Sequence, residues 1–341
     1  MRKLRVAVMM LEDSVPPDNI EGLTDKEIAP YKTEYDVLSA LEELGHEARP
    51  LPVSDELGAI RVGLRHMKPH IVFNLLEEFR GVGIYVPYVL GYLELMRQPY
   101  TGCNPYGMML THNKAVAKKI LKHHRIPAPD FAMFPQGRAI RRPRRLQFPL
   151  IVKSTTEHGS VGIAQASVVH DDEKLAERVE FVHGELQTDA IAEEFIEGRE
   201  LYVGVIGNQR LDTFPVWELR FEELPDDAPR IATAKVKWDW GYQKKIGVTT
   251  QAAKKLPEGA EERIYRLCKR AYRLLGQSGY ARMDLRLTAE GRIYLLESNP
   301  NPQLEFGEDF AESAELARVP YDRLIQRILN LGLRYGAEWK S

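Results

Sequence analysis

Two short segments near the C-terminal end of the chain combine an arginine, two carboxylates and an amide at a spacing that could support chemistry. Arg282 and Asp284 are two residues apart, and so are Glu297 and Asn299. Side chains two residues apart in a strand point to the same face. Each pair would therefore present its polar groups together if both segments are strands.

The sequence around these residues predicts a β-hairpin. Tyr280–Leu287 and Arg292–Glu297 alternate in the manner of strands, and Glu290–Gly291 is typical of a two-residue turn. This turn places Asp284 opposite Glu297 and the arginine opposite the asparagine. Opposed carboxylates destabilise a sheet unless a cation lies between them, and two carboxylates with an amide oxygen suit Mg²⁺. The alternative is an exposed hairpin with solvated acids.

A second group of residues could bind phosphate. Phe148–Lys153 is predicted to be an apolar strand that ends in a lysine, and the loop after it is rich in Gly, Ser and Thr, including Gly159 and Ser160. Backbone N–H groups and hydroxyls of such a loop can bind phosphate oxygens, while Lys153 supplies positive charge. The residue order is not that of a Walker A loop, and an ordinary hairpin turn would use the same residue types.

A third segment is a strand that stops at a turn around Gly198 and then resumes. A strand end has backbone donors and acceptors without partners, and these could bind the edge of an adenine ring. Glu200 follows the turn and could bind ribose hydroxyls. An ordinary β-turn is the alternative.

Composition excludes several classes of protein. The chain has 341 residues, 44% of them hydrophobic, and its 47 Lys and Arg nearly cancel 49 Asp and Glu, for a net charge of −2. One large or two to three ordinary domains are expected, with no overall charge to attract nucleic acid or an anionic membrane. Cys103 and Cys268 are far apart, which favours reduced thiols in the cytoplasm. No apolar stretch approaches the length of a membrane span.

The secondary structure expected to position these residues differs between the first hundred residues and the second half of the chain. Apolar strands alternate with amphipathic helices in the first hundred residues, which predicts an α/β layer with a parallel sheet. The strands are expected at Val6–Met10, Glu47–Leu51 and Ile71–Leu75, and the helices at Tyr35–Leu44, Asp55–Met67 and Ile84–Leu95. A further helix is expected at Lys114–His124. Hairpins in the second half indicate α+β structure, with earlier strands at Phe148–Lys153, Ala190–Phe195 and Glu200–Ile206.

These features, in this order, resemble the ATP-grasp superfamily and, within it, the D-alanine-D-alanine ligase branch. The resemblance extends from about Thr111 to Pro302. It implies an ATP-grasp fold with an N-terminal Rossmann-like (pre-ATP-grasp) domain, that is, α/β and α+β architecture. The implied domains are an N-terminal α/β domain at 1–110, a central ATP-grasp domain at 111–207, and a C-terminal ATP-grasp domain with the Mg-binding hairpin at 208–341.

The resemblance also implies roles for residues that match the family's motifs. Those expected at the phosphates of ATP are Lys114, Lys153, Gly159 and Ser160, with Lys235 as the lid lysine and Lys237 as its alternative. Those expected at the base and sugar are Glu193, Glu194, Phe195 and Ile196 at the hinge, Glu200 at the ribose and Leu296 under the adenine. Arg282 is expected to steady the transferred phosphoryl group, and the implied Mg²⁺ ligands are Asp284, Glu297 and Asn299.

The substrate side departs from the D-alanine-D-alanine ligase pattern. Val8–Asp13 stands in place of a Gly-Gly-x-Ser start, Gly159 in place of a serine, and Val236 in place of a tyrosine. Leu76–Gly81 likewise replaces a histidine-glycine motif. The substrates are therefore not expected to be two molecules of D-alanine.

An acidic run follows the metal motif, where that branch has a serine that holds the second substrate's carboxylate. The run contains Glu305, Glu308 and Asp309. An anionic rim disfavours a free carboxylate and favours a cation, so Glu305 is predicted to contact an acceptor amine that is more cationic or is carried on a larger molecule. The alternative is that these acids open the final helix, where the helix dipole favours them.

The sequence thus predicts an ATP-dependent carboxylate-amine ligase that forms an amide bond through an acyl phosphate. ATP and Mg²⁺ are the expected cofactors, and small-molecule or peptide carboxylates and amines are the expected substrates. No nucleic acid or membrane partner is expected, and the resemblance implies a homodimer. Two hypotheses compete: a small-molecule kinase that stops after phosphoryl transfer, and a nucleotide-binding regulator without turnover.

Overall fold

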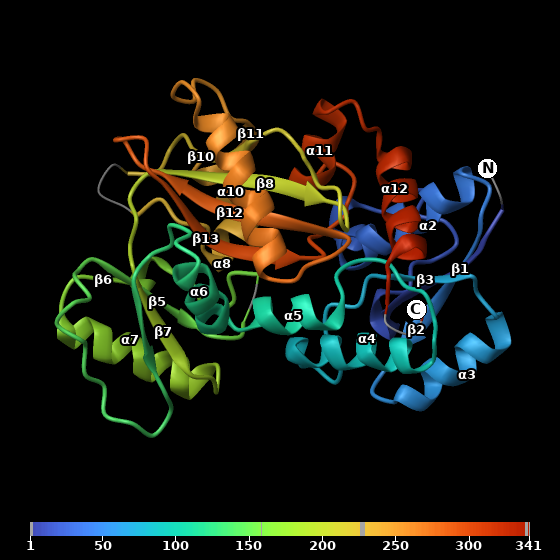
Figure 1. Ribbon diagram of the computed structural model, residues 1–341, viewed down its shortest axis with the longest axis horizontal. Helices are drawn as coiled ribbons and strands as arrows, with labels where there is room; N and C mark the ends of the chain where they lie inside the picture. Colours follow the sequence, from blue (N-terminus) through green and yellow to red (C-terminus); the bar gives the residue numbers. More distant parts are fainter. Residues whose placement is uncertain (1–2, 158, 226–228, 338–339, 341) are drawn as a thin grey trace.

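A computed structural model describes residues 3–157, 159–225, 229–337 and 340, apart from the side chains of Trp238 and Trp240. Within these residues the strands form three sheets, one for each part of the chain (Figure 1). None of the helices found there has the length and apolar character needed to cross a bilayer.

The N-terminal sheet is parallel, as the alternation of strands and helices predicts. Its order is β2-β1-β3, formed by Glu47–Val53, Arg5–Leu11 and Ile71–Asn74. Alternate residues of β1 enter two different cores, with Val6 and Val8 on one face and Ala7 and Met9 on the other. Helices therefore have to cover both faces.

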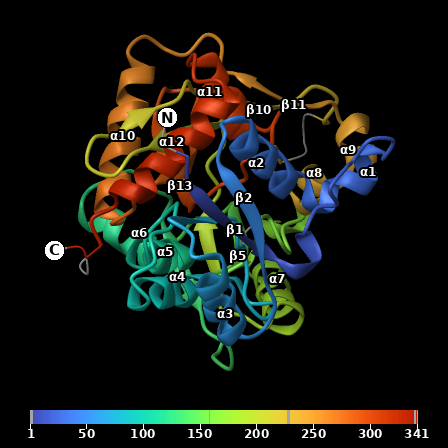
Figure 2. The same cartoon turned by 90° about the vertical axis from the view of Figure 1, so that its right-hand side faces the viewer.

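Helices cover both faces of this sheet. α2 (Lys32–Glu43) and α12 (Tyr321–Arg334) pack on one face, and α3 (Leu57–Met67) and α4 (Val86–Leu95) pack on the other. Figures 1 and 2 show α12, the last helix, alongside α2. The C-terminal helix thus completes the first domain, although its residues lie in the range expected for the third.

The central sheet is antiparallel and has the order β4-β7-β5-β6. Its strands are Phe131–Phe134, Ala190–Glu194, Leu150–Ser154 and Val168–Val169. α7 (Asp172–Glu185) packs on one face through Leu175, Val179 and Val182. The expected strands at Phe148–Lys153 and Ala190–Phe195 are confirmed, with shifts of one or two residues at their ends.

The C-terminal sheet is also antiparallel and has the order β11-β10-β8-β12-β13, with β9 (Asp212–Thr213) attached to β8. The five strands are Val248–Ala252, Trp217–Phe221, Arg199–Ile206, Tyr280–Leu287 and Ile293–Pro300. Because β8 bonds to β10 and β12, this sheet begins before the expected domain boundary at 207, which is a correction to that division.

The two faces of the C-terminal sheet differ. Leu201 and Val203 of β8, with Ala281 and Met283 of β12, pack beneath α10 (Ala260–Leu274) in one apolar core. The alternate residues of the same two strands face the other way, and they include three of the charged residues singled out from the sequence, Glu200, Arg282 and Asp284.

Polar contacts join the N-terminal domain to the hairpin. Asn301, just after β13, accepts a hydrogen bond on Oδ1 from the backbone N–H of Cys103 at 2.8 Å. Asn104 caps α5 (Pro105–His112), and its backbone N–H donates to the Ser278 hydroxyl at 2.9 Å. These contacts fix the hairpin against the linker that leaves the first domain.

Candidate active site

The hairpin at the centre of the site has the predicted register at its polar end. Asp284 lies opposite Glu297, and Arg282 lies opposite Asn299. The turn is one residue longer than predicted, however, because Thr288 donates its N–H to the carbonyl of Arg292.

A β-bulge reconciles the longer turn with the predicted pairs. Asp284 pairs with Glu297, but the next residue, Leu285, pairs with Leu295, so Leu296 has no direct partner on β12. Bulges re-aim side chains and occur next to active sites. Leu296, expected under the adenine, is therefore the extra residue of the bulge and is half-buried.

Asp284 is the anchor of the polar face and is only 6% exposed. Arg282 donates to both of its oxygens, from Nε at 2.8 Å and from Nη2 at 2.9 Å. Asn299 Nδ2 donates to Asp284 Oδ2 at 3.0 Å and lies 3.5 Å from Glu297 Oε1. The guanidinium carbon of Arg282 lies 4.6 Å from the centroid of the Tyr202 ring. Four groups expected to act together are thus in contact.

The donor set of this face fits a divalent cation. Burial and the nearby charge of Glu297 raise the pKa of Asp284, although Arg282 opposes the shift. A cation between the two carboxylates would relieve that repulsion, and a rotation of the Asn299 amide would present a third hard oxygen. In the described parts of the chain, no group of three or more His, Cys, Asp and Glu is arranged to hold a metal, so any ion here relies on two carboxylates and the amide.

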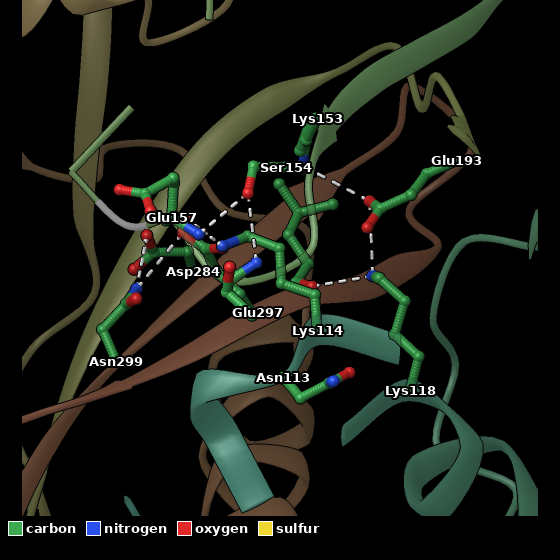
Figure 3. Close-up of polar contacts among 12 residues, drawn as sticks. Asn113, Lys114, Lys118, Lys153, Ser154, Glu157, Glu193, Asp284, Glu297 and Asn299 are labelled. Atoms are coloured by element: carbon green, nitrogen blue, oxygen red, sulfur yellow. Dashed lines mark hydrogen bonds and ion pairs between the residues drawn. The ribbon is translucent and has the colours of Figure 1, made fainter. Parts of the chain in front are cut away.

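Three lysines converge beside the acidic hairpin (Figure 3). Lys114 opens α6 (Lys114–His123) and is 6% exposed; its Nζ donates to the carbonyl of Glu157 at 2.5 Å and lies 3.8 Å from Glu297 Oε2. Lys153 Nζ lies 3.3 Å from Glu193 Oε2. Each of the two lysines expected at the phosphates therefore lies against a carboxylate of the site.

The third lysine, Lys118, was not predicted from the sequence. Its Nζ lies 3.3 Å from Glu193 Oε2 and donates to the carbonyl of Leu296 at 2.8 Å. The signal that could have identified it is its position one helical turn after Lys114, which places both on one face of α6. Lys118 therefore connects the hinge strand to the bulge.

Burial lowers the pKa of a lysine and nearby carboxylates raise it, so the balance of the two sets the pKa of each of these lysines. Desolvation lowers the pKa of Lys114 even though Glu297 favours its charged form. Burial also acts against the charge of Lys153, but Glu193 and Glu297 outweigh it and raise the pKa of that lysine. The two predicted phosphate lysines therefore have different electrostatic environments.

The loop after β5 turns sharply, as its composition predicts. The Ser154 hydroxyl accepts hydrogen bonds from the N–H groups of Thr156 and Glu157 at 3.2 and 3.0 Å. Gly159 and Ser160 both have left-handed backbones, with φ of 64°. His158, between these parts of the loop, lies outside the described residues. Arg178 of α7 donates to the carbonyl of Gly162 and thereby anchors the end of the loop.

The hinge differs in part from the expectation. The N–H groups of Glu194 and Phe195 are already engaged, by the carbonyls of Asp130 at 2.8 Å and Pro149 at 2.9 Å. Those two donors are therefore not free for an adenine edge. Ile196 follows directly, and Glu193 directs its carboxylate at the lysines, with an Oε1 that is buried and has no hydrogen-bond partner within the described residues.

The segment over the site contains α8 (Ala234–Trp238) and α9 (Trp240–Lys245). Lys235 is exposed, and its Nζ lies 6.0 Å from the centroid of the Tyr242 ring. Lys237 is half-buried, and burial together with the charge of Arg282 lowers its pKa. The charges of Arg282 and Asp284 thus act on Lys237, while the expectation that Lys235 is the lid lysine stays a prediction.

Glu305 lies at the boundary with the first domain and is already paired. Its Oε1 is 3.5 Å from Lys32 Nζ, and its Oε2 accepts a hydrogen bond from Gln303 Nε2 at 2.8 Å. Of the three acids in the run, Asp309 lies in the first turn of α11 (Asp309–Leu316) and Glu308 is the N-cap residue of that helix. The helix-dipole alternative therefore applies to these two and not to Glu305.

Comparisons with known proteins agree with this arrangement. The family model described as D-ala D-ala ligase C-terminus matches residues 120–330. A D-alanine–D-alanine ligase of Actinobacillus succinogenes is 30% identical over 311 residues, covering 87% of this chain and 91% of its own length. An uncharacterized protein of Sinorhizobium fredii, y4sG, is also 30% identical, over 309 residues, covering 87% of this chain and 86% of its own.

Solved structures match the fold along almost the whole chain. The D-alanine–D-alanine ligase of Bacillus anthracis complexed with ATP superposes with a TM-score of 0.75 at 21% identity, covering 97% of this chain and 98% of its own. The D-alanine–D-alanine ligase of Coxiella burnetii has a TM-score of 0.73 at 17% identity, covering 99% and 96%. With the match to the family model, these similarities mean that the chain belongs to the D-alanine–D-alanine ligase family of ATP-grasp ligases.

Proposed function

We propose that this ATP-dependent ligase joins a carboxylate to an amine through an acyl phosphate and that its substrates are not two molecules of D-alanine. The observation that supports this most directly is the arrangement of Arg282, Asp284 and Glu297 on one face beside two lysines, Lys114 and Lys153. Phosphoryl transfer depends mainly on positioned charge, and this arrangement supplies both signs at short range.

The proposed reaction has two steps. A carboxylate oxygen of the first substrate attacks the γ-phosphorus of ATP, so that ADP leaves and an acyl phosphate forms. The neutral amine of the second substrate then attacks the acyl carbon and the bond from that carbon to the phosphate oxygen breaks. Inorganic phosphate leaves with the proton that the amine loses, and an amide remains. The protein has to hold negative charge in both steps.

Arg282 is suited to this task because it is fixed before any substrate arrives. Two of its five N–H groups are used by Asp284, and three remain for phosphoryl or carbonyl oxygens. Asp284, Glu297 and Asn299 would hold Mg²⁺, which when bound would neutralise charge on the phosphate oxygens. Lys114 and Lys153 would bind phosphate oxygens through their ammonium groups.

The acceptor is proposed to carry additional positive charge. Burial, reinforced by Asp309 and Glu305, raises the pKa of Glu308, and the same carboxylate interacts with the charge of Arg282. Glu77 extends this acidic rim, since its charge and that of Glu305 both act on Glu34. Burial together with the charge of Glu78 raises the pKa of Glu77. A cationic substrate would relieve the repulsion in this rim, whereas the carboxylate of a free amino acid would increase it. Lys32 already compensates part of the charge of Glu305, so Glu305 would contribute to this attraction mainly through its effect on Glu308.

The test is a screen of carboxylate and amine pairs for ADP release, with mass spectrometry of the products and D-alanine alone as reference. Amide formation that depends on the amine, and that favours amines with a second positive charge, is the expected result. Turnover of D-alanine alone at a rate equal to the best pair would contradict the substrate proposal. A stable phosphorylated product would indicate the kinase instead, and ATP binding without turnover would indicate the regulator.

A further inference from the structure

Arg286 is a buried arginine on the site face of β12 to which the sequence drew no attention. It lies two residues after Asp284, is only 4% exposed, and pairs in register with Glu200 of β8. Its Nη2 donates to Glu200 Oε2 at 2.7 Å. The Tyr202 hydroxyl donates to the other oxygen, Glu200 Oε1, at 2.9 Å. Both oxygens of the proposed ribose carboxylate are therefore held by the protein.

These two hydrogen bonds fix the Glu200 carboxylate but leave it able to accept further hydrogen bonds. Each carboxylate oxygen can accept about two hydrogen bonds, so one position remains on each. Two acceptor positions on one rigid carboxylate suit two adjacent hydroxyls, as in the 2′,3′-diol of a ribonucleotide. The carboxylate could not keep that orientation without donors behind it.

The same guanidinium also holds two backbone segments. Nη1 donates to the carbonyl of Gly198 at 2.7 Å, and Nη2 donates to the carbonyl of Arg230 at 2.6 Å. Gly198 belongs to the turn after the hinge, and Arg230 lies just before the segment that carries α8. The turn is tightly packed, since a Cβ on Gly198 would lie 2.3 Å from the carbonyl oxygen of Leu287. Arg286 thus joins the hinge turn, the ribose carboxylate and the start of the lid segment.

We propose that Arg286 is a positioning residue that sets the ribose end of the nucleotide site by orienting Glu200 and fixing the hinge turn to the lid segment. The inference rests on the proposed role of Glu200 in ATP binding. A buried arginine is costly unless it is fully paired, and here each partner belongs to a segment around the nucleotide. A purely structural arginine would not discriminate between nucleotides that differ only in the sugar.

The test compares the affinities of ATP and 2′-deoxy-ATP, each with Mg²⁺, by calorimetry on the full-length protein. Arg286→Met is expected to weaken ATP binding by about 10- to 100-fold, the value of one hydrogen bond to a charged group, and to weaken 2′-deoxy-ATP binding less. The preference for ATP therefore falls. Arg286→Lys is expected to keep part of that preference because it retains the charge.

Arg199→Met is a matched control. Arg199 also pairs with a glutamate through two hydrogen bonds, to Glu218 at 2.7 Å each, and donates to a backbone carbonyl, that of Lys254 at 2.8 Å. It lies on the opposite face of the same sheet, next to Leu201. The control should lose stability in thermal unfolding but keep the wild-type preference between the two nucleotides.

Tyr202→Phe keeps the inference testable if Arg286→Met does not fold. It retains the ring beneath Arg282 and removes only the second hydrogen bond to Glu200, so it too should lower the preference for ATP. A folded Arg286→Met or Tyr202→Phe variant with the wild-type ratio of affinities would overturn the inference and leave the proposed function in place. A wild-type protein that does not bind ATP would overturn both.

Discussion

Lys118 and Glu193 form an ion pair in which the two side chains are only 2% and 1% exposed, with 3.3 Å between Nζ and Oε2. The pair joins the start of α6 to β7, and Lys118 extends it to the bulge through the carbonyl of Leu296. Since two charges are removed from water here, each needs the other. The lysine is thus part of the frame that holds the hinge and the hairpin together.

Replacement of Lys118 by methionine should be strongly destabilising. Glu193 would keep only Lys153 as a cation, and the Leu296 carbonyl would lose its donor. We expect the free energy of unfolding to fall by about 3 kcal/mol, measured by urea denaturation. Lys119→Met is the control, because Lys119 is exposed on the same helix. Equal stabilities of the two variants would contradict the inference that Lys118 holds the hinge strand and the hairpin together.

The Glu297→Ala variant should lose turnover. It removes one of the two opposed carboxylates, together with the counter-charge of Lys114. We expect ADP release to fall by about three orders of magnitude, since a bound metal supplies several kcal/mol of charge stabilisation. Glu290→Ala, at the exposed turn of the same hairpin, should leave the rate unchanged. Retained activity of Glu297→Ala would remove the basis for the metal site.

The polar end of this hairpin could be predicted from sequence because its pattern has a strict period of two. The predicted turn was one residue too short, and the correct pairs arose because the bulge at Leu296 shifts the register back. Sequence patterning does not reveal such a bulge, since it depends on what packs behind the strand. Here that includes Lys118, which bonds to the bulged carbonyl.

The residues that the sequence did not identify are those whose roles depend on contacts between distant segments. Arg286 meets Glu200 across two strands whose pairing requires the sheet order β8-β12. Lys118 likewise meets Glu193 only because α6 packs against β7. Local periodicity predicts where helices and strands lie and which of their side chains share a face, whereas these contacts depend on tertiary packing.

The two lid lysines should differ in their effects on catalysis. Lys237→Met is expected to lower kcat by about 100-fold, as for the loss of one positioned donor to developing charge. Lys235→Met should have a much smaller effect because its side chain is exposed beside Tyr242. Single-turnover measurement of ADP formation would compare them. A larger loss in Lys235→Met would show that the lid changes position when ATP binds and would restore the expectation from sequence.

Glu34 should make the stability of the protein depend on pH near neutrality. Burial, reinforced by Glu77 and Glu305, raises the pKa of Glu34 from 4.5 to about 7. The folded state therefore binds this proton more tightly than the unfolded state, so stability falls as the pH rises from about 4.5 to about 7 and stays lower above that range.

Glu34→Gln removes the charge, so the variant should be more stable than the wild type at pH 8, by about 2 kcal/mol, with a much smaller difference at pH 5. Urea unfolding at both pH values measures this, with Glu42→Gln, exposed on the same helix, as control. The same stability difference at both pH values would mean that Glu34 does not carry the repulsion of the acidic rim, and a cationic acceptor would then gain nothing from it.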